Sequence, residues 1–79
     1  MTANSLRYIT SKQVRMARAG MRWTLLELAA RSGVGYRTIH RFEIDQCKPR
    51  AKTLAAIRTA FEAAGVEFAG LSGVILSDD

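Results

Sequence analysis

Two arginines and a short basic loop are the residues of this 79-residue sequence whose types and spacing suggest chemistry. Arg37 and Arg41 are four residues apart, so a helix would project both guanidinium groups from one face. Lys48 and Arg50 flank Pro49 a few residues later. Side chains of this kind attract anions, and the segment is therefore suited to a polyanionic partner. In an arbitrary helix, however, such a pair of arginines is more often an ordinary solvated face.

The distribution of charge along the chain supports a polyanionic partner. The sequence has 12 Lys and Arg residues against 7 Asp and Glu residues, a formal net charge of +5. All 12 basic residues lie in residues 1–58, whereas residues 59–79 contain four acidic residues and no basic one. A basic body with an acidic tail indicates binding to nucleic acid or to an anionic surface.

The sequence lacks the residue sets that catalysis and metal binding require. It contains no pair of carboxylates at catalytic spacing, no Ser-His-Asp set and no phosphate-binding glycine loop. His40 and Cys47 are the only residues of their types, so neither has a ligand set, and Cys47 cannot form an internal disulfide. We therefore expect no enzyme activity, no cofactor and no metal.

The cysteine content and the hydropathy of the sequence also indicate where in the cell the protein is located. The single thiol fits a reducing cytoplasm. No apolar run approaches the ~18 residues that a membrane span needs, and the first residues have no apolar core of a secretory signal. The sequence thus predicts a cytoplasmic protein that does not interact with membranes.

Capping-box spacings predict the beginnings of the first two helices. Thr10 precedes a helix expected at about 11–19, with a glutamine three positions later that can reach back to the cap. Gly20 is expected to end this helix. Thr24 starts a second helix in the same way, and Gly33 is expected to stop it in a left-handed conformation.

Two further helices follow from the spacing of apolar residues. A third helix is expected at about 36–43, with Ile39 and Phe42 on its inner side and the remaining side chains facing outward. A fourth is expected at about 51–64, where an apolar stripe recurs at helical spacing before Gly65. The fold class is therefore mainly all-α.

The last residues have a different pattern. Val66 to Phe68 alternates between apolar and charged residues, and Val74 to Leu76 is a short apolar run, so residues 66–79 are expected to form a short β-hairpin or strand. An isolated hairpin is marginally stable in water, so it should pack on the helices or pair with a second chain. We therefore divide the chain into a flexible N-terminal arm (1–10), a helical domain (11–65) and a β tail (66–79).

The connection between the second and third helices is the most specific feature. Only Ser32-Gly33-Val34-Gly35 separates them. Ala29 is small enough for a close approach of the helices, Gly33 supplies the turn conformation and Ile39 fills the space between the helices. These are the requirements of a helix-turn-helix.

The stretch WTLLELAARSGVGYRTIHRFE (Trp23–Glu43) resembles the helix-turn-helix of the lambda-repressor-like, Xre-type DNA-binding regulators. The segment Lys48–Phe68 is similar to the end of many short members, so the resemblance extends over about residues 11–76. It implies a lambda-repressor-like domain of four to five helices, with the short C-terminal β-hairpin or strand in addition.

The resemblance also implies a role for individual residues. The third helix would be the recognition helix, and Tyr36, Arg37 and Arg41 would read bases in the major groove. Arg37 is the first choice, because a guanidinium group fits the O6 and N7 edge of guanine. Phosphate contacts would come from Thr38, Lys48 and Arg50. The recognition helix would be supported by an ion pair between Arg18 and Glu43 and by the packing residues Ala29, Gly33 and Ile39.

These observations predict a sequence-specific double-stranded DNA-binding transcriptional regulator, a repressor that acts as a homodimer. A dimer is expected because half-sites one helical turn apart, ~34 Å, require two reading helices. The tail should contribute the dimer contact through its apolar residues, Val66, Phe68, Val74, Ile75 and Leu76.

The alternative is a protein-binding module on the same fold, such as an antitoxin that binds a toxin or an antiactivator that binds an activator. Leu25 and Leu26, where relatives are commonly polar, and the acidic tail favour it.

Overall fold

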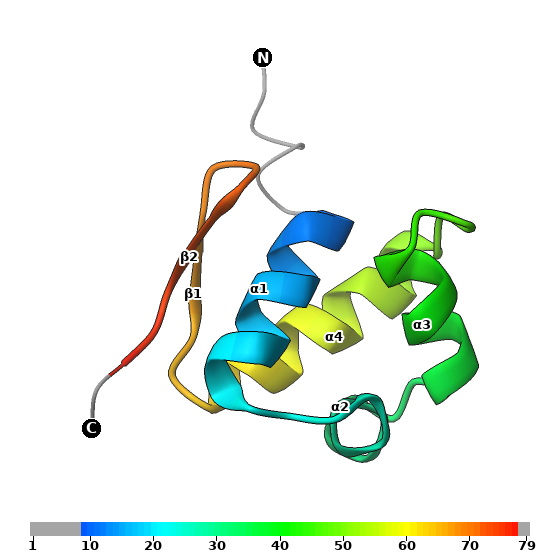
Figure 1. Ribbon diagram of the computed structural model, residues 1–79, viewed down its shortest axis with the longest axis horizontal. Helices are drawn as coiled ribbons and strands as arrows, with labels where there is room; N and C mark the ends of the chain where they lie inside the picture. Colours follow the sequence, from blue (N-terminus) through cyan, green and yellow to red (C-terminus); the bar gives the residue numbers. More distant parts are fainter. Residues whose placement is uncertain (1–8, 78–79) are drawn as a thin grey trace.

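The computed structural model describes residues 9–77 and contains four helices followed by one antiparallel hairpin (Figure 1). The mainly α-helical fold with a C-terminal hairpin is therefore confirmed. The elements are α1 (Ser11–Met21), α2 (Leu25–Ser32), α3 (Tyr36–Glu43), α4 (Ala51–Ala63), β1 (Glu67–Ala69) and β2 (Gly73–Ile75).

Side-chain caps begin α1 and α2, as the sequence predicts. At α1, the Thr10 hydroxyl accepts a hydrogen bond from the Gln13 amide at 3.1 Å, and the Gln13 side chain accepts one from the Thr10 amide at 3.0 Å. At α2, the Thr24 hydroxyl accepts from the Glu27 amide at 3.0 Å. Each bond satisfies a donor that the first turn of a helix leaves open.

The end of α1 differs from the prediction, because the helix continues through Gly20 to Met21. Arg22 ends it in a left-handed conformation with φ 60°, and its amide donates to the carbonyl oxygen of Ala19 at 3.1 Å. Gly20 instead makes room for the tail: a Cβ atom there would lie 2.5 Å from a methyl carbon of Leu76. Glycine thus serves close packing at this position rather than termination.

The other helix ends agree with the sequence to within one residue. Gly33 caps α2 at φ 76°, and Asp45 adopts φ 61° just after α3. Helix α4 ends at Ala63, one residue before the predicted end, and Gly65 follows at φ 94°. Left-handed backbone at these points turns the chain sharply and lets the next element pack back on the core.

The N-terminal arm contributes to the fold at its last two residues. The predicted arm comprises residues 1–10, of which 1–8 lie outside the described part of the chain. Ile9 is buried in the core, and Thr10 is the cap of α1. The helical domain therefore includes two residues that the sequence assigns to the arm.

The core lies where the four helices and the hairpin meet. Its aromatic part is a stack of Trp23 on Phe61, with ring centroids 5.1 Å apart, and Phe68 meets the edge of Phe61 at 5.8 Å. Buried apolar side chains come from every helix and from the segments before α1, between α1 and α2, and after α4; they are Ile9, Val14, Ala17, Trp23, Leu28, Ile39, Phe42, Ile57, Phe61 and Val66.

The hairpin has an inner and an outer face. Phe68 pairs with Val74 across the strands, and both side chains are half-buried against the core. Glu67 pairs with Ile75, and both are exposed. This alternation follows from the two-residue period of a strand.

A buried glutamine attaches the hairpin to the start of α1. The Gln13 side chain is fully buried, and its Nε2 donates to the carbonyl oxygens of Gly70 at 3.1 Å and Gly73 at 3.0 Å. The Thr10 hydroxyl donates to the carbonyl oxygen of Leu71 at 2.9 Å. The cap of α1 therefore also holds a turn about 60 residues later in the chain. The sequence predicts the cap but not this attachment.

Replacing Gln13 by leucine should lower the free energy of unfolding by about 3 kcal/mol, because two carbonyl groups and one amide lose their partner. Urea denaturation measures this loss of stability. The substitution should also accelerate amide hydrogen exchange more in the hairpin than in α4. Lys12→Leu, at the exposed neighbouring position, is the matched control and should change stability by less than about 0.5 kcal/mol. Equal losses in the two variants would contradict the attachment.

Candidate nucleic-acid interface

The turn between α2 and α3 is short and internally bonded. The Gly33 amide donates to the carbonyl oxygen of Ala29 at 2.9 Å, and the Ser32 hydroxyl accepts from the Val34 amide at 3.2 Å. A Cβ atom on Gly33 would meet nothing within 4 Å, so glycine is needed here for its positive φ and not for space. Ala29, in the middle of α2, packs against the core.

Helix α3 has one buried and one exposed side. Ile39 and Phe42 enter the core, as the sequence predicts. The opposite side carries the predicted reading residues Tyr36, Arg37 and Arg41, which are all exposed, together with the exposed side chains of Thr38 and His40. In Figure 1, α3 lies at the margin of the molecule, on the side opposite the hairpin. Its outer side is therefore accessible to a large partner.

The loop after α3 continues this exposed surface. The Cys47 sulfur lies 3.9 Å from the carbonyl oxygen of Thr38, which places the start of the loop beside α3. Lys48 and Arg50, the predicted phosphate ligands, are both exposed in this loop. Lys52, which is not among the predicted phosphate ligands, is exposed in the first turn of α4. Its position two residues after Arg50 is the signal that could have identified it.

The two acidic residues of this region are turned toward α1. Arg18 donates two hydrogen bonds to the Glu43 carboxylate, from Nε at 2.7 Å and from Nη2 at 2.9 Å. The Glu43 side chain is only 5% exposed. Arg15 donates to the carbonyl oxygen of Glu43 and lies 3.8 Å from the Asp45 carboxylate, which also accepts from Ser11. The structure thus brings the predicted partners Arg18 and Glu43 together.

The surface that remains is cationic. Between residues 36 and 52, five exposed cations form no ion pair within the described residues 9–77, and the region's two acids are both engaged by α1. The five are Arg37, Arg41, Lys48, Arg50 and Lys52. Elsewhere, Arg31 and Arg58 are paired with glutamates on their own helices. Positive charge is therefore left uncompensated mainly along α3 and the loop after it.

The same contacts determine the charge state of Arg18. Its hydrogen bond with Glu43 raises the pKa of the guanidinium above its ordinary value, and the smaller effect of burial opposes this. Because the folded-state pKa is raised, titration of Arg18 removes the ion pair only at strongly alkaline pH. At neutral pH the Arg18 guanidinium is therefore charged.

Within residues 9–77, the titratable side chains of this region do not form a cluster of metal ligands. In the described part of the chain, no group of three His, Cys, Asp or Glu residues could hold a metal ion. His40 is exposed and Cys47 half-buried. Between residues 9 and 77, none of the helices has the length and apolar character of a membrane span.

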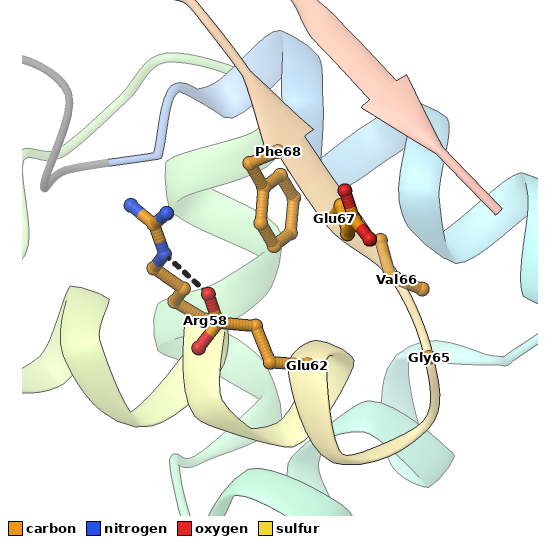
Figure 2. Close-up of a pocket in the computed structure, with 6 residues that line it drawn as sticks. All are labelled: Arg58, Glu62, Gly65, Val66, Glu67 and Phe68. Carbon is orange, nitrogen blue, oxygen red and sulfur yellow. Dashed lines mark hydrogen bonds and ion pairs between the residues drawn. The ribbon is translucent and has the colours of Figure 1, made fainter. Parts of the chain in front are cut away.

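The structure has a pocket elsewhere, between the end of α4 and β1 (Figure 2). Its volume is about 360 Å³, and Arg58 donates to Glu62 across it at 2.9 Å. The Arg58 guanidinium also lies 5.7 Å from the Phe68 ring. None of the lining residues belongs to α2 or α3, so the pocket is separate from the candidate interface; they are Arg58, Glu62, Gly65, Val66, Glu67 and Phe68.

The residues predicted for a dimer contact have different environments in the tail. Val66 is 1% exposed and belongs to the core of the single chain, while Phe68 and Val74 pack against that core. Ile75 and Leu76 are exposed. Only these last two present much apolar surface to a second molecule.

Comparison of the sequence with models of known protein families and with curated proteins found no match.

Replacing Arg18 by methionine should lower the free energy of unfolding by about 3 kcal/mol, because the buried Glu43 carboxylate loses its ion pair. The double variant Arg18→Met with Glu43→Leu should recover much of that loss, because no buried charge is then left unpaired. Urea denaturation of the two variants and of the unchanged protein tests this. A double variant that is less stable than Arg18→Met alone would contradict it.

Proposed function

We propose that this protein is a sequence-specific, double-stranded DNA-binding transcriptional regulator, a repressor, that reads the major groove with α3. The proposal places it in the cytoplasm and, for half-sites on two successive turns of DNA, requires two copies. The resemblance of Trp23–Glu43 to the helix-turn-helix of lambda-repressor-like, Xre-type regulators supports this assignment.

One observation carries the proposal: the only two acids between residues 36 and 52 are held by α1, and the exposed cations there have no acidic partner in the described residues. A solvated basic face in an ordinary helix commonly includes acids at i, i+4 spacing, as α2 and α4 do. In α3 the acid is instead used to attach the helix, which leaves the outer side for an anion.

The exposed side of α3 has the chemistry that base recognition needs. Arg37 lies in the first turn of α3 and Arg41 one turn later, so both project from one side. A guanidinium group donates two parallel hydrogen bonds to guanine O6 and N7. The exposed Tyr36 ring, at the start of the same helix, can contact a thymine methyl group or donate to a phosphate.

Phosphate contacts complete the proposed complex. Lys48 and Arg50 extend from the loop beside α3, and Thr38 offers a hydroxyl on the helix itself. Such contacts raise the affinity for every sequence and establish the register of α3 in the groove. Each neutralised phosphate also releases counterions, so affinity should fall steeply with salt.

A protein-binding function is the second candidate, and one observation favours it. Leu26 is 66% exposed on α2, the largest exposed fraction among the large apolar side chains of the described residues. An antitoxin or antiactivator could use this residue to bind a toxin or an activator. Failure to bind DNA at low salt would favour this alternative.

Arg37→Ala and Lys48→Ala should weaken DNA binding in different ways. Selection from a random duplex pool first gives a preferred site, and fluorescence anisotropy then compares that site with a scrambled one over a range of salt. Arg37→Ala should cost about 1–3 kcal/mol on the preferred site and relax the preference at one base pair. Lys48→Ala should weaken both duplexes alike and lower the salt slope by about one.

Arg58→Gln is the control, because it removes one positive charge beside the pocket, away from α2 and α3. It should leave the preference for the selected site unchanged. If the unchanged protein binds no duplex at low salt, the proposed function is wrong. If Arg37→Ala and Lys48→Ala weaken all sequences equally, α3 does not read bases.

A further inference from the structure

His40 lies on the exposed surface of α3 beside the two reading arginines. It is the only histidine in the chain, and its side chain is exposed. It follows Arg37 by three residues and directly precedes Arg41, so it belongs to the same outer side of the helix. An imidazole ordinarily changes its charge between about pH 5 and 8, whereas a guanidinium group stays charged. The surface proposed for DNA therefore includes a side chain whose charge depends on pH.

Helical geometry places His40 on one flank of the two arginines and the basic loop (residues 46–50) on the other. Successive residues of an α-helix are rotated by about 100°, so Tyr36 and His40 lie on one flank and Thr38 on the opposite one. The Cys47 sulfur is 3.9 Å from the carbonyl oxygen of Thr38, so the loop begins on the Thr38 side. A helix in the major groove lies between two phosphate backbones. The loop and His40 would then face different backbones.

The carboxylates on and just after α3 are held by α1 and do not bind the imidazole. Arg18 holds Glu43 at 2.7 Å, and Arg15 lies 3.8 Å from Asp45. In the described part of the chain, the side chain of His40 forms no hydrogen bond or ion pair. A protonated His40 thus has no acidic partner on its own helix.

The elements packed against α3 offer no unpaired carboxylate either. Their remaining charged or titratable residues are Lys12 of α1, Glu27 and Arg31 of α2, and Cys47, Lys48 and Arg50 of the loop. The one acid among these, Glu27, is paired with Arg31 at 3.4 Å. The charged form of His40 therefore requires an anion from outside residues 9–77.

A phosphate group of the DNA backbone has the chemistry to be that anion. A nearby negative charge favours the protonated form of an imidazole, and both ring nitrogens of that form are hydrogen-bond donors. DNA binding then takes up a proton. Because the coupling of two ligands is reciprocal, a phosphate that favours the proton requires that the proton favour DNA by the same factor.

We propose that His40 makes DNA binding proton-dependent, by donating a hydrogen bond in its protonated form to a backbone phosphate on the side of the major groove opposite the basic loop. The inference rests on the proposed function, because it assigns a further contact and a regulation to the same surface. Arg37 and Arg41 provide the sequence preference at every pH, and His40 adds affinity for every duplex as the pH falls below about 7.

Fluorescence anisotropy with the selected duplex, at constant ionic strength, tests the proton dependence. The unchanged protein should bind about five-fold more tightly at pH 5.5 than at pH 7.5, the change expected when a phosphate moves the midpoint of one imidazole titration by about one pH unit. The dependence of affinity on salt should also be steeper at pH 5.5 by about one in slope, because one more phosphate is neutralised. Circular dichroism at both pH values checks that the protein stays folded.

Three variants assign the effect to one side chain. His40→Gln, which keeps a polar group but cannot take up a proton, should bind with the same affinity at both pH values. His40→Lys is charged throughout and should bind more tightly than His40→Gln by about five-fold at either pH. The matched control adds Thr59→His, at an exposed position of α4, to His40→Gln, and it should not restore the pH dependence.

Nuclear magnetic resonance gives a direct readout, because the chain has a single imidazole Cε1 proton signal. Its titration midpoint should rise by about one pH unit when the selected duplex is added. A midpoint that does not move, equal affinity of the unchanged protein at both pH values, or a pH dependence that persists in His40→Gln would overturn this inference and leave the proposed function intact. A protein that binds no duplex at either pH would overturn both.

Discussion

The buried carboxylate of Glu43 is the constraint on which the rest of the structure depends. It lies at the last residue of α3 and is nearly inaccessible to water, so it requires a cation. Arg18 supplies that cation through two hydrogen bonds, and Arg15 holds the carbonyl oxygen of the same residue. Because positive groups at a helix C-terminus also complement the helix dipole, both contacts stabilise α3 where it meets α1. The orientation of the exposed side of α3 is therefore set by α1.

Helix α1 also holds the other end of the molecule. While its arginines contact α3, its buried Gln13 donates to the turn of the hairpin. Its apolar residues Val14 and Ala17 enter the core between these two polar contacts. One helix of 11 residues thus positions both the cationic surface proposed for DNA and the hairpin on the opposite side of the fold (Figure 1).

Most of the fold could be predicted from the sequence because local rules decide it. Capping threonines, Gly33 and the apolar spacing of α3 act within a few residues, and the structure has them where the sequence places them. Gly20 shows the limit of this reasoning. A glycine near a helix end usually indicates termination, but Leu76, more than fifty residues later, packs against Gly20, and the helix continues. Nothing near Gly20 in the sequence contains that information.

The sequence by itself determined the helices, the turn between α2 and α3, the hairpin and the separation of basic body from acidic tail. These follow from short-range hydrogen bonding, side-chain periodicity and composition. Only the tertiary structure decided that Asp45 faces α1 and that Gln13 donates to the hairpin. It also decided that Val66 is buried in the core while Ile75 is exposed. Each of these depends on which residues meet across long sequence separations. The sequence carries the charges of the surface along α3, and the fold decides which of them are compensated.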